Sequence, residues 1–191
     1  MHAPARPSAR LARLFPLAAL LWQGALGAPP VDTNYYPHRP GTRWTYSSGE
    51  TQVVGAPITH RGVRVVPVSH QYGSTTYTQD LIEHRADGSV WLRGVNAGGR
   101  LSWYASPLNI YPPGPLSPGR SWTGSAGTLR TRSTVTGVTP LKLAGGTFNT
   151  LTIRTETTAG GKVSVQTTYF VPTVGIVRYQ TADGSVIDLL R

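Results

Sequence analysis

Residues Gly145 to Arg191 read GGTFNTLTIRTETTAGGKVSVQTTYFVPTVGIVRYQTADGSVIDLLR, and this stretch decides the fold. Between Lys162 and Val171 apolar side chains alternate with polar ones, which is the two-residue period of a half-buried strand. Asp183-Gly184 separates two further β-branched runs and is a strong hairpin signal. The stretch therefore predicts consecutive antiparallel hairpins.

The same alternation of short strands and turns extends back to residue 40. A second Asp-Gly turn, Asp87-Gly88, separates the β-type runs Thr75–His84 and Val90–Val95. No window of 11 or more residues beyond the first thirty carries an apolar stripe of helical period. Residues 40–191 are therefore predicted to be one all-β domain: a single curved antiparallel meander sheet, or half-barrel, of about ten to twelve strands with little helix.

The segment Pro107 to Pro118 interrupts this pattern, because five of its twelve residues are proline. Proline has no N–H for the ladder and fixes its own φ angle, so a proline-rich run is disfavoured in a central strand. We predict an irregular crossover over residues 107–118 that divides the sheet into two halves.

The N-terminus is typical of a secretory signal peptide. Arg6, Arg10 and Arg13 precede an apolar run, Leu14–Leu26, which is shorter than the roughly 20 residues of a membrane-spanning helix. Small residues then favour cleavage before Ala28, although an uncleaved anchor is the alternative. Residues 1–27 are therefore predicted to be the signal and residues 28–39 an extended lead-in, leaving an exported protein of the periplasm, envelope or extracellular space with no integral membrane segment.

The amino-acid composition excludes several kinds of chemistry and binding partner. The sequence has no cysteine, which excludes disulfides, thiol chemistry and the cysteine that lipid anchoring requires. Of 18 basic and 8 acidic residues, three arginines lie in the signal, so 15 basic residues remain against 8 acidic and the net charge is near +7. The basic residues are scattered, with Arg61/Arg64 and Arg130/Arg132 the closest pairs, and we expect no nucleic-acid partner.

No motif predicts catalysis, a metal or a cofactor. Asp80, Glu83, His84 and Asp87 form the best local cluster, but Glu83 and His84 should point to opposite faces of one strand. A Gly-x-Ser-x-Gly nucleophile elbow is absent. We therefore expect no catalytic residue, no metal ligand and no cofactor, with a carboxylate-dependent hydrolase as the enzymatic alternative.

Aromatic residues are the strongest hint of a binding site. Most should fill the core, but several flank the proline-rich segment, and long irregular loops often cover binding sites. We predict that the following residues line the largest pocket or close the mouth of the half-barrel: Trp103, Tyr104, Ile110, Tyr111 and Trp122.

Three short motifs resemble a large set of bacterial exported proteins and lipoproteins. They are Tyr36-Pro37 with Gly41-x-x-Trp44-x-Tyr46, Gly146-Thr147-Phe148-x-x-Leu151-x-Ile153, and Tyr169-Phe170 with Val174-Gly175-x-Val177. The resemblance covers most of the chain after the signal. It implies a curved sheet or half-barrel similar in outline to the lipoprotein carriers of the bacterial envelope, and it implies no catalytic residue.

Three functions follow as alternatives. The first is a non-catalytic exported module that binds an apolar or amphipathic ligand or a partner protein, with a lipid, a glycan or an envelope protein as the expected partner. The second is a structural or cell-surface interaction role, and the third is the hydrolase. An open concave face would favour the first, and a fully packed interior would favour the second.

Overall fold

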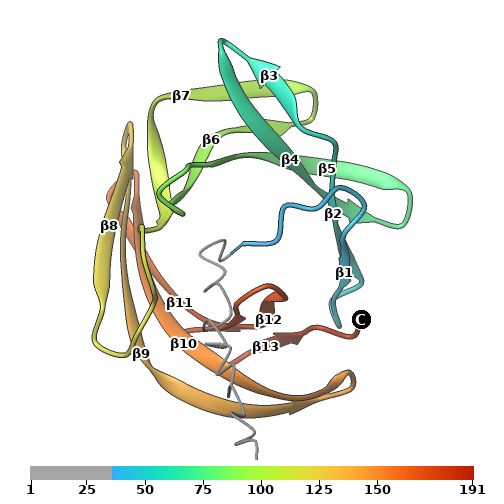
Figure 1. Cartoon of the computed structure of the whole chain (residues 1–191), viewed down its shortest axis with the longest axis vertical. Helices are drawn as coiled ribbons and strands as arrows, with labels where there is room; N and C mark the ends of the chain where they lie inside the picture. The colour runs from blue at the N-terminus through green and yellow to red at the C-terminus, as the bar shows by residue number, and fades with distance from the viewer. Residues whose placement is uncertain (1–35) are drawn as a thin grey trace, which may run out of the picture. The chain divides into compact units, whose positions relative to one another are not determined.

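The computed structural model describes residues 36–191, and all of its strand pairs are antiparallel (Figure 1). No helix with the length and apolar character needed to cross a bilayer occurs in this range. The all-β antiparallel fold is therefore confirmed. The predicted signal peptide and most of the lead-in lie outside the described residues.

The strands form two sheets, each made of consecutive segments of the chain. The seven-stranded sheet has the order β1-β2-β4-β5-β6-β7, with β3 paired to β4. Its strands are β1 (Arg43–Thr45), β2 (Glu50–Val54), β3 (Ile58–His60), β4 (Val63–Tyr72), β5 (Thr75–His84), β6 (Val90–Ala97) and β7 (Arg100–Tyr111).

The six-stranded sheet has the order β13-β12-β11-β10-β9-β8. Its strands are β8 (Ser121–Ala126), β9 (Leu129–Leu143), β10 (Gly146–Ala159), β11 (Lys162–Val171), β12 (Gly175–Thr181) and β13 (Val186–Asp188). The stretch Gly145–Arg191 thus forms four consecutive strands, as its pattern predicts. The two predicted Asp-Gly turns also form, with Gly88 at φ 81° and Gly184 at φ 87°.

The crossover between the sheets is shorter than predicted. Strand β7 continues through Pro107 to Tyr111, and the irregular part begins only at Pro112. The pairing of β7 with β6 jumps from Trp103–Gly94 to Leu108–Leu92, so four residues of β7 bulge out of the register. Pro107 lies in this bulge, where a missing ladder N–H has no cost.

The remaining loop is fixed to the body by its own side chains. Leu116 is buried in the core, and the guanidinium of Arg120 donates hydrogen bonds to the carbonyl oxygens of Pro113 and Pro115. Leu108 and Tyr111, in the last part of β7 before this loop, are buried as well.

Along one side, the two sheets are joined by segments near the two ends of the described chain. Tyr46 forms a bridge with Leu189, and the backbone N–H of Leu190 donates to the carbonyl of Thr45 at 2.8 Å. On the other side β7 approaches β8 closely at Gly124. A Cβ atom there would lie 2.8 Å from the backbone oxygen of Asn109, so only glycine permits this approach.

The core lies between the inner faces of the two sheets. Its indole and phenol groups tie the sheets together: Nε1 of Trp44 donates to the carbonyl of Val174 at 2.6 Å, and the hydroxyl of Tyr46 donates to the carbonyl of Ile176 at 2.9 Å. Tyr36 of the lead-in packs against Trp44 with ring centroids 6.0 Å apart.

Candidate functional site

Three of the five predicted site residues come together between the sheets. Ile110, Tyr111 and Trp122 line a cavity of about 180 Å³, together with residues from the inner face of the six-stranded sheet, among them Ile153, Thr168 and Tyr179. Trp103 and Tyr104 are not in its lining, because they precede the bulge that redirects β7. Trp103 instead packs against His60 with ring centroids 4.7 Å apart.

The aromatic walls of this cavity are packed and hydrogen-bonded to neighbouring groups. Tyr111 and Trp122 are buried, and Tyr111 lies against Phe170 with ring centroids 4.9 Å apart. Nε1 of Trp122 donates to the carbonyl of Ile110 at 2.9 Å, which fixes the indole across the gap between the sheets. Ligand binding by the five predicted residues stays a prediction.

A second cavity of about 250 Å³ adjoins the first. The two share Gln166 and Tyr179 as lining residues. The second cavity is amphipathic, since the apolar side chain of Ile187 and the rings of Tyr46 and Tyr179 face polar groups on β2 and β4. The other residues that line it are Glu50, Gln52, His70, Gln166, Thr181 and Ser185.

An ionic cluster borders the second cavity and contributes Glu50 and His70 to its lining. His70 on β4 lies between two carboxylates: its Nδ1 is 2.8 Å from Oε1 of Glu50, and its Nε2 is 3.2 Å from Oδ2 of Asp80. Glu50 also accepts a hydrogen bond from the amide of Gln52 at 2.9 Å. The cluster joins β2, β4 and β5.

The charge state of the cluster follows from these contacts. Burial by itself would lower the pKa of His70, but the hydrogen bonds and charges of Asp80 and Glu50 outweigh burial and raise the pKa to about 9. The hydrogen bond from His70 likewise lowers the pKa of Glu50. At neutral pH the cluster therefore holds an imidazolium between carboxylates, with a net negative charge.

This arrangement argues against a nucleophilic triad at His70. In such a triad one ring nitrogen faces a carboxylate and the other faces the nucleophile. Here both nitrogens face carboxylates, and the protonated ring cannot accept a proton. No group of three or more potential metal ligands occurs within residues 36–191.

The acidic cluster expected from the sequence is divided by the structure. Asp80 joins His70, whereas Glu83 pairs with Arg93 at 2.6 Å and with Arg85 at 3.1 Å. Asp87 caps its own turn by accepting from the N–H of Ser89 at 2.9 Å. Sequence reasoning missed the Glu50–His70–Asp80 cluster, because three strands contribute one residue each.

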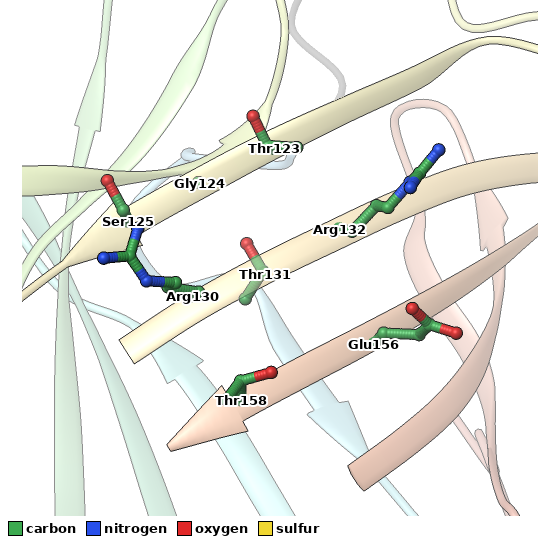
Figure 2. A pocket seen from close by; sticks show the side chains of 8 residues that line it. All are labelled: Thr123, Gly124, Ser125, Arg130, Thr131, Arg132, Glu156 and Thr158. Atoms are coloured by element: carbon green, nitrogen blue, oxygen red, sulfur yellow. The ribbon is translucent and has the colours of Figure 1, made fainter. Parts of the chain in front are cut away.

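A larger hollow than these two cavities lies elsewhere and contains none of the predicted residues. It has a volume of about 410 Å³ and is lined by β8, β9 and β10. Figure 2 shows Arg130 extending toward Ser125 and Arg132 extending the other way from the same strand. Glu156 at its edge pairs with Arg154 at 2.7 Å. The lining is almost entirely polar: Thr123, Gly124, Ser125, Arg130, Thr131, Arg132, Glu156 and Thr158.

Comparisons with known proteins give a distant likeness only. No protein-family model matches the sequence, and no curated protein is significantly similar to it. Among solved structures, a protein inferred to be exported, with a YmcC-like fold, from Bacteroides fragilis is 14% identical with a TM-score of 0.48. A protein inferred to be a lipoprotein from Parabacteroides distasonis is 13% identical with a TM-score of 0.43. Each comparison covers 82% of this chain and 97% of the other. The resemblance to envelope lipoprotein carriers stays a prediction.

Proposed function

We propose that this chain is an exported, non-catalytic module that binds an apolar or amphipathic ligand between its two sheets. The observation that carries the proposal is the pair of adjoining cavities that share Gln166 and Tyr179. Each cavity is smaller than the roughly 300 Å³ at the lower end of small-molecule sites, so a ligand would occupy both.

The linings favour a ligand with one apolar and one polar end. The first cavity has apolar and aromatic side chains in its lining, among them Ile153, Tyr111 and Trp122, and these suit a hydrocarbon or a ring. Polar side chains such as Ser133 and Thr155 line the rest of it. Glu50 and His70 border the second, which suits a hydrogen-bonding head group. Because two carboxylates outnumber one imidazolium, a cationic or neutral head group is favoured over an anionic one.

Export is part of the proposal and is supported by the basic and apolar segments of residues 1–27. The expected partner remains a lipid, a glycan or an envelope protein. The structural role is the competing function, and it is favoured by the packed aromatic residues that occupy much of the space between the sheets, such as Tyr36, Tyr111 and Phe170.

The test is binding of an apolar fluorescent probe, N-phenyl-1-naphthylamine, to the purified protein. Ile187→Trp places a large ring in the second cavity and should weaken probe binding by about tenfold or more, which corresponds to about 1.4 kcal/mol. Val186→Trp is the matched control, because the adjacent side chain is exposed and points to the opposite face.

Head-group preference is tested by displacing the probe with dodecylamine or dodecanoate. The amine should compete better than the acid, and Glu50→Gln should reduce the difference. Failure of both compounds and of the probe to bind, with both tryptophan variants folded, would support the structural role instead.

A further inference from the structure

A second group of basic side chains lies at the far end of the inner face of β4 and β5. Arg64 and Val66 share a face of β4 with His70, since these positions are separated by even numbers of residues. His84 likewise shares a face of β5 with Ile82 and Asp80. Arg64 is six residues from His70, or about 20 Å along the strand. The inner face of these strands thus has an acidic end, an apolar middle and a basic end.

The basic end encloses a cavity of about 220 Å³ that shares no lining residue with the two cavities of the proposed ligand site. It is lined by His38, Pro57, Arg64, Val66 and His84. His38 belongs to the lead-in and is exposed, and its ring lies over that of His84 with centroids 4.7 Å apart. No acidic residue is present in this lining.

His84 is the anomaly of the region. Both of its ring nitrogens are buried, and neither has a hydrogen-bond partner among residues 36–191. Buried polar atoms are nearly always paired, because an unpaired one forfeits its bond to water without replacement. Burial, helped by the nearby His38, lowers the pKa of His84 to about 4, so at neutral pH its ring has one N–H donor and one acceptor to offer.

The side chains that line this cavity favour an anion over a metal ion. A metal ion would find only two imidazoles and would be repelled by Arg64, whose guanidinium forms no ion pair with any carboxylate of the described residues. An oxyanion would receive a guanidinium and imidazole N–H groups, which are strong charge-assisted donors. The volume suits a small ligand, and Val66 and Pro57 provide an apolar wall for a short carbon chain.

We propose that this cavity binds a small oxyanion, either a carboxylate or a phosphate group, held by Arg64 and His84 and covered by His38. The anion supplies the partner that the imidazole of His84 lacks. The ring of His38 must move aside to admit it, and His38 can do so because it lies on the exposed lead-in. Binding also favours protonation of His84, because a negative charge beside an imidazole stabilises its charged form.

The experiment is a titration of the histidine ring signals by NMR at pH 7, with acetate in one arm and inorganic phosphate in the other. The His38 and His84 signals should shift saturably in at least one arm, and the stronger response identifies the class of oxyanion. At a saturating concentration, the pKa of His84 should rise above its value of about 4 in the anion-free protein.

Variants separate a site from general attraction of anions to a basic protein. Arg64→Gln should weaken binding of the anion by about tenfold, which is the effect expected from loss of one charge-assisted hydrogen bond. Arg100→Gln removes an equal charge from the first residue of β7 and should leave affinity unchanged. Because His84→Gln changes a buried side chain, its circular dichroism spectrum is compared with the parent's, and Arg64→Gln tests the site independently.

The proposal is overturned if neither anion gives a saturable shift, or if Arg100→Gln and Arg64→Gln weaken binding equally. It is also overturned if Zn²⁺ perturbs both rings while neither anion does. These outcomes are independent of probe binding between the sheets, because the two sites share no residue.

Discussion

Gly124 offers a direct test of how the two sheets approach each other. A Cβ atom at this position would lie 2.8 Å from the backbone oxygen of Asn109, 2.8 Å from Oγ1 of Thr131 and 2.9 Å from Cδ1 of Leu108. The side chains could adjust, but the carbonyl belongs to β7 and can move only if β7 moves away from β8. Gly124→Ala should therefore strain the contact between the sheets.

The magnitude combines two opposing effects. Overpacking in a well-packed region costs about 1–3 kcal/mol. Replacing glycine by alanine also reduces the freedom of the unfolded chain, which stabilises the protein by about 0.4–1 kcal/mol where the backbone permits it. We expect a net loss of about 1–2 kcal/mol in the free energy of unfolding.

Gly137 is a matched control in the neighbouring strand β9, because a Cβ atom there meets no atom within 4 Å. Gly137→Ala should be neutral or slightly stabilising. The assay is reversible urea unfolding followed by tryptophan fluorescence. With a slope of about 2 kcal/mol per molar urea, Gly124→Ala should lower the midpoint by about 0.5–1 M. Equal midpoints for the two variants would refute the close contact at Gly124.

Three further predictions concern separate parts of the chain. Trp44→Phe removes the hydrogen bond to Val174 while keeping most of the ring, and should lower the free energy of unfolding by about 1–2 kcal/mol in the same urea assay. NMR should show His70 titrating near pH 9, and Glu50→Gln should lower that value. Because folding raises the pKa of His70, the stability that protonated His70 contributes is complete below about pH 6.5 and is lost as the pH rises through 9. The urea midpoints of the parent and of His70→Gln should therefore converge at high pH. Protein exported by a bacterial host should begin at Ala28 by intact mass, and a mass that includes Met1 would contradict the signal-peptide prediction.

Much of the fold could be predicted because its signals are local. Alternation and Asp-Gly turns involve residues next to each other in sequence, so the strands from Gly146 onward are evident without coordinates. The misses have physical causes as well. Ile58–His60 is too short to show a period, and Pro107 is tolerated in β7 only because a bulge removes its need for a ladder partner.

The candidate site was harder to predict from the sequence than the fold. Gln52 pairs with His70 and Val68 pairs with Asp80, and these registers bring Glu50, His70 and Asp80 together. The register between β4 and β5 shifts after His70, which no sequence pattern indicates. Trp103 and Tyr111 are close in sequence to the same proline-rich segment, yet the bulge between them directs only Tyr111 into the cavity between the sheets.

The joint between Tyr46 and Leu189 has a consequence for the order of folding. Within each sheet, strands pair mainly with neighbours in sequence, so most pairings close only short loops. The Tyr46–Leu189 bridge and the bond from Trp44 to Val174 connect residues more than 100 positions apart. Closing loops of this length costs more entropy than closing the short hairpin loops, and we expect these contacts to form after the hairpins. The cavities between the sheets would then exist only after this later step, so variants that weaken the joint should lose ligand binding before they lose strand content.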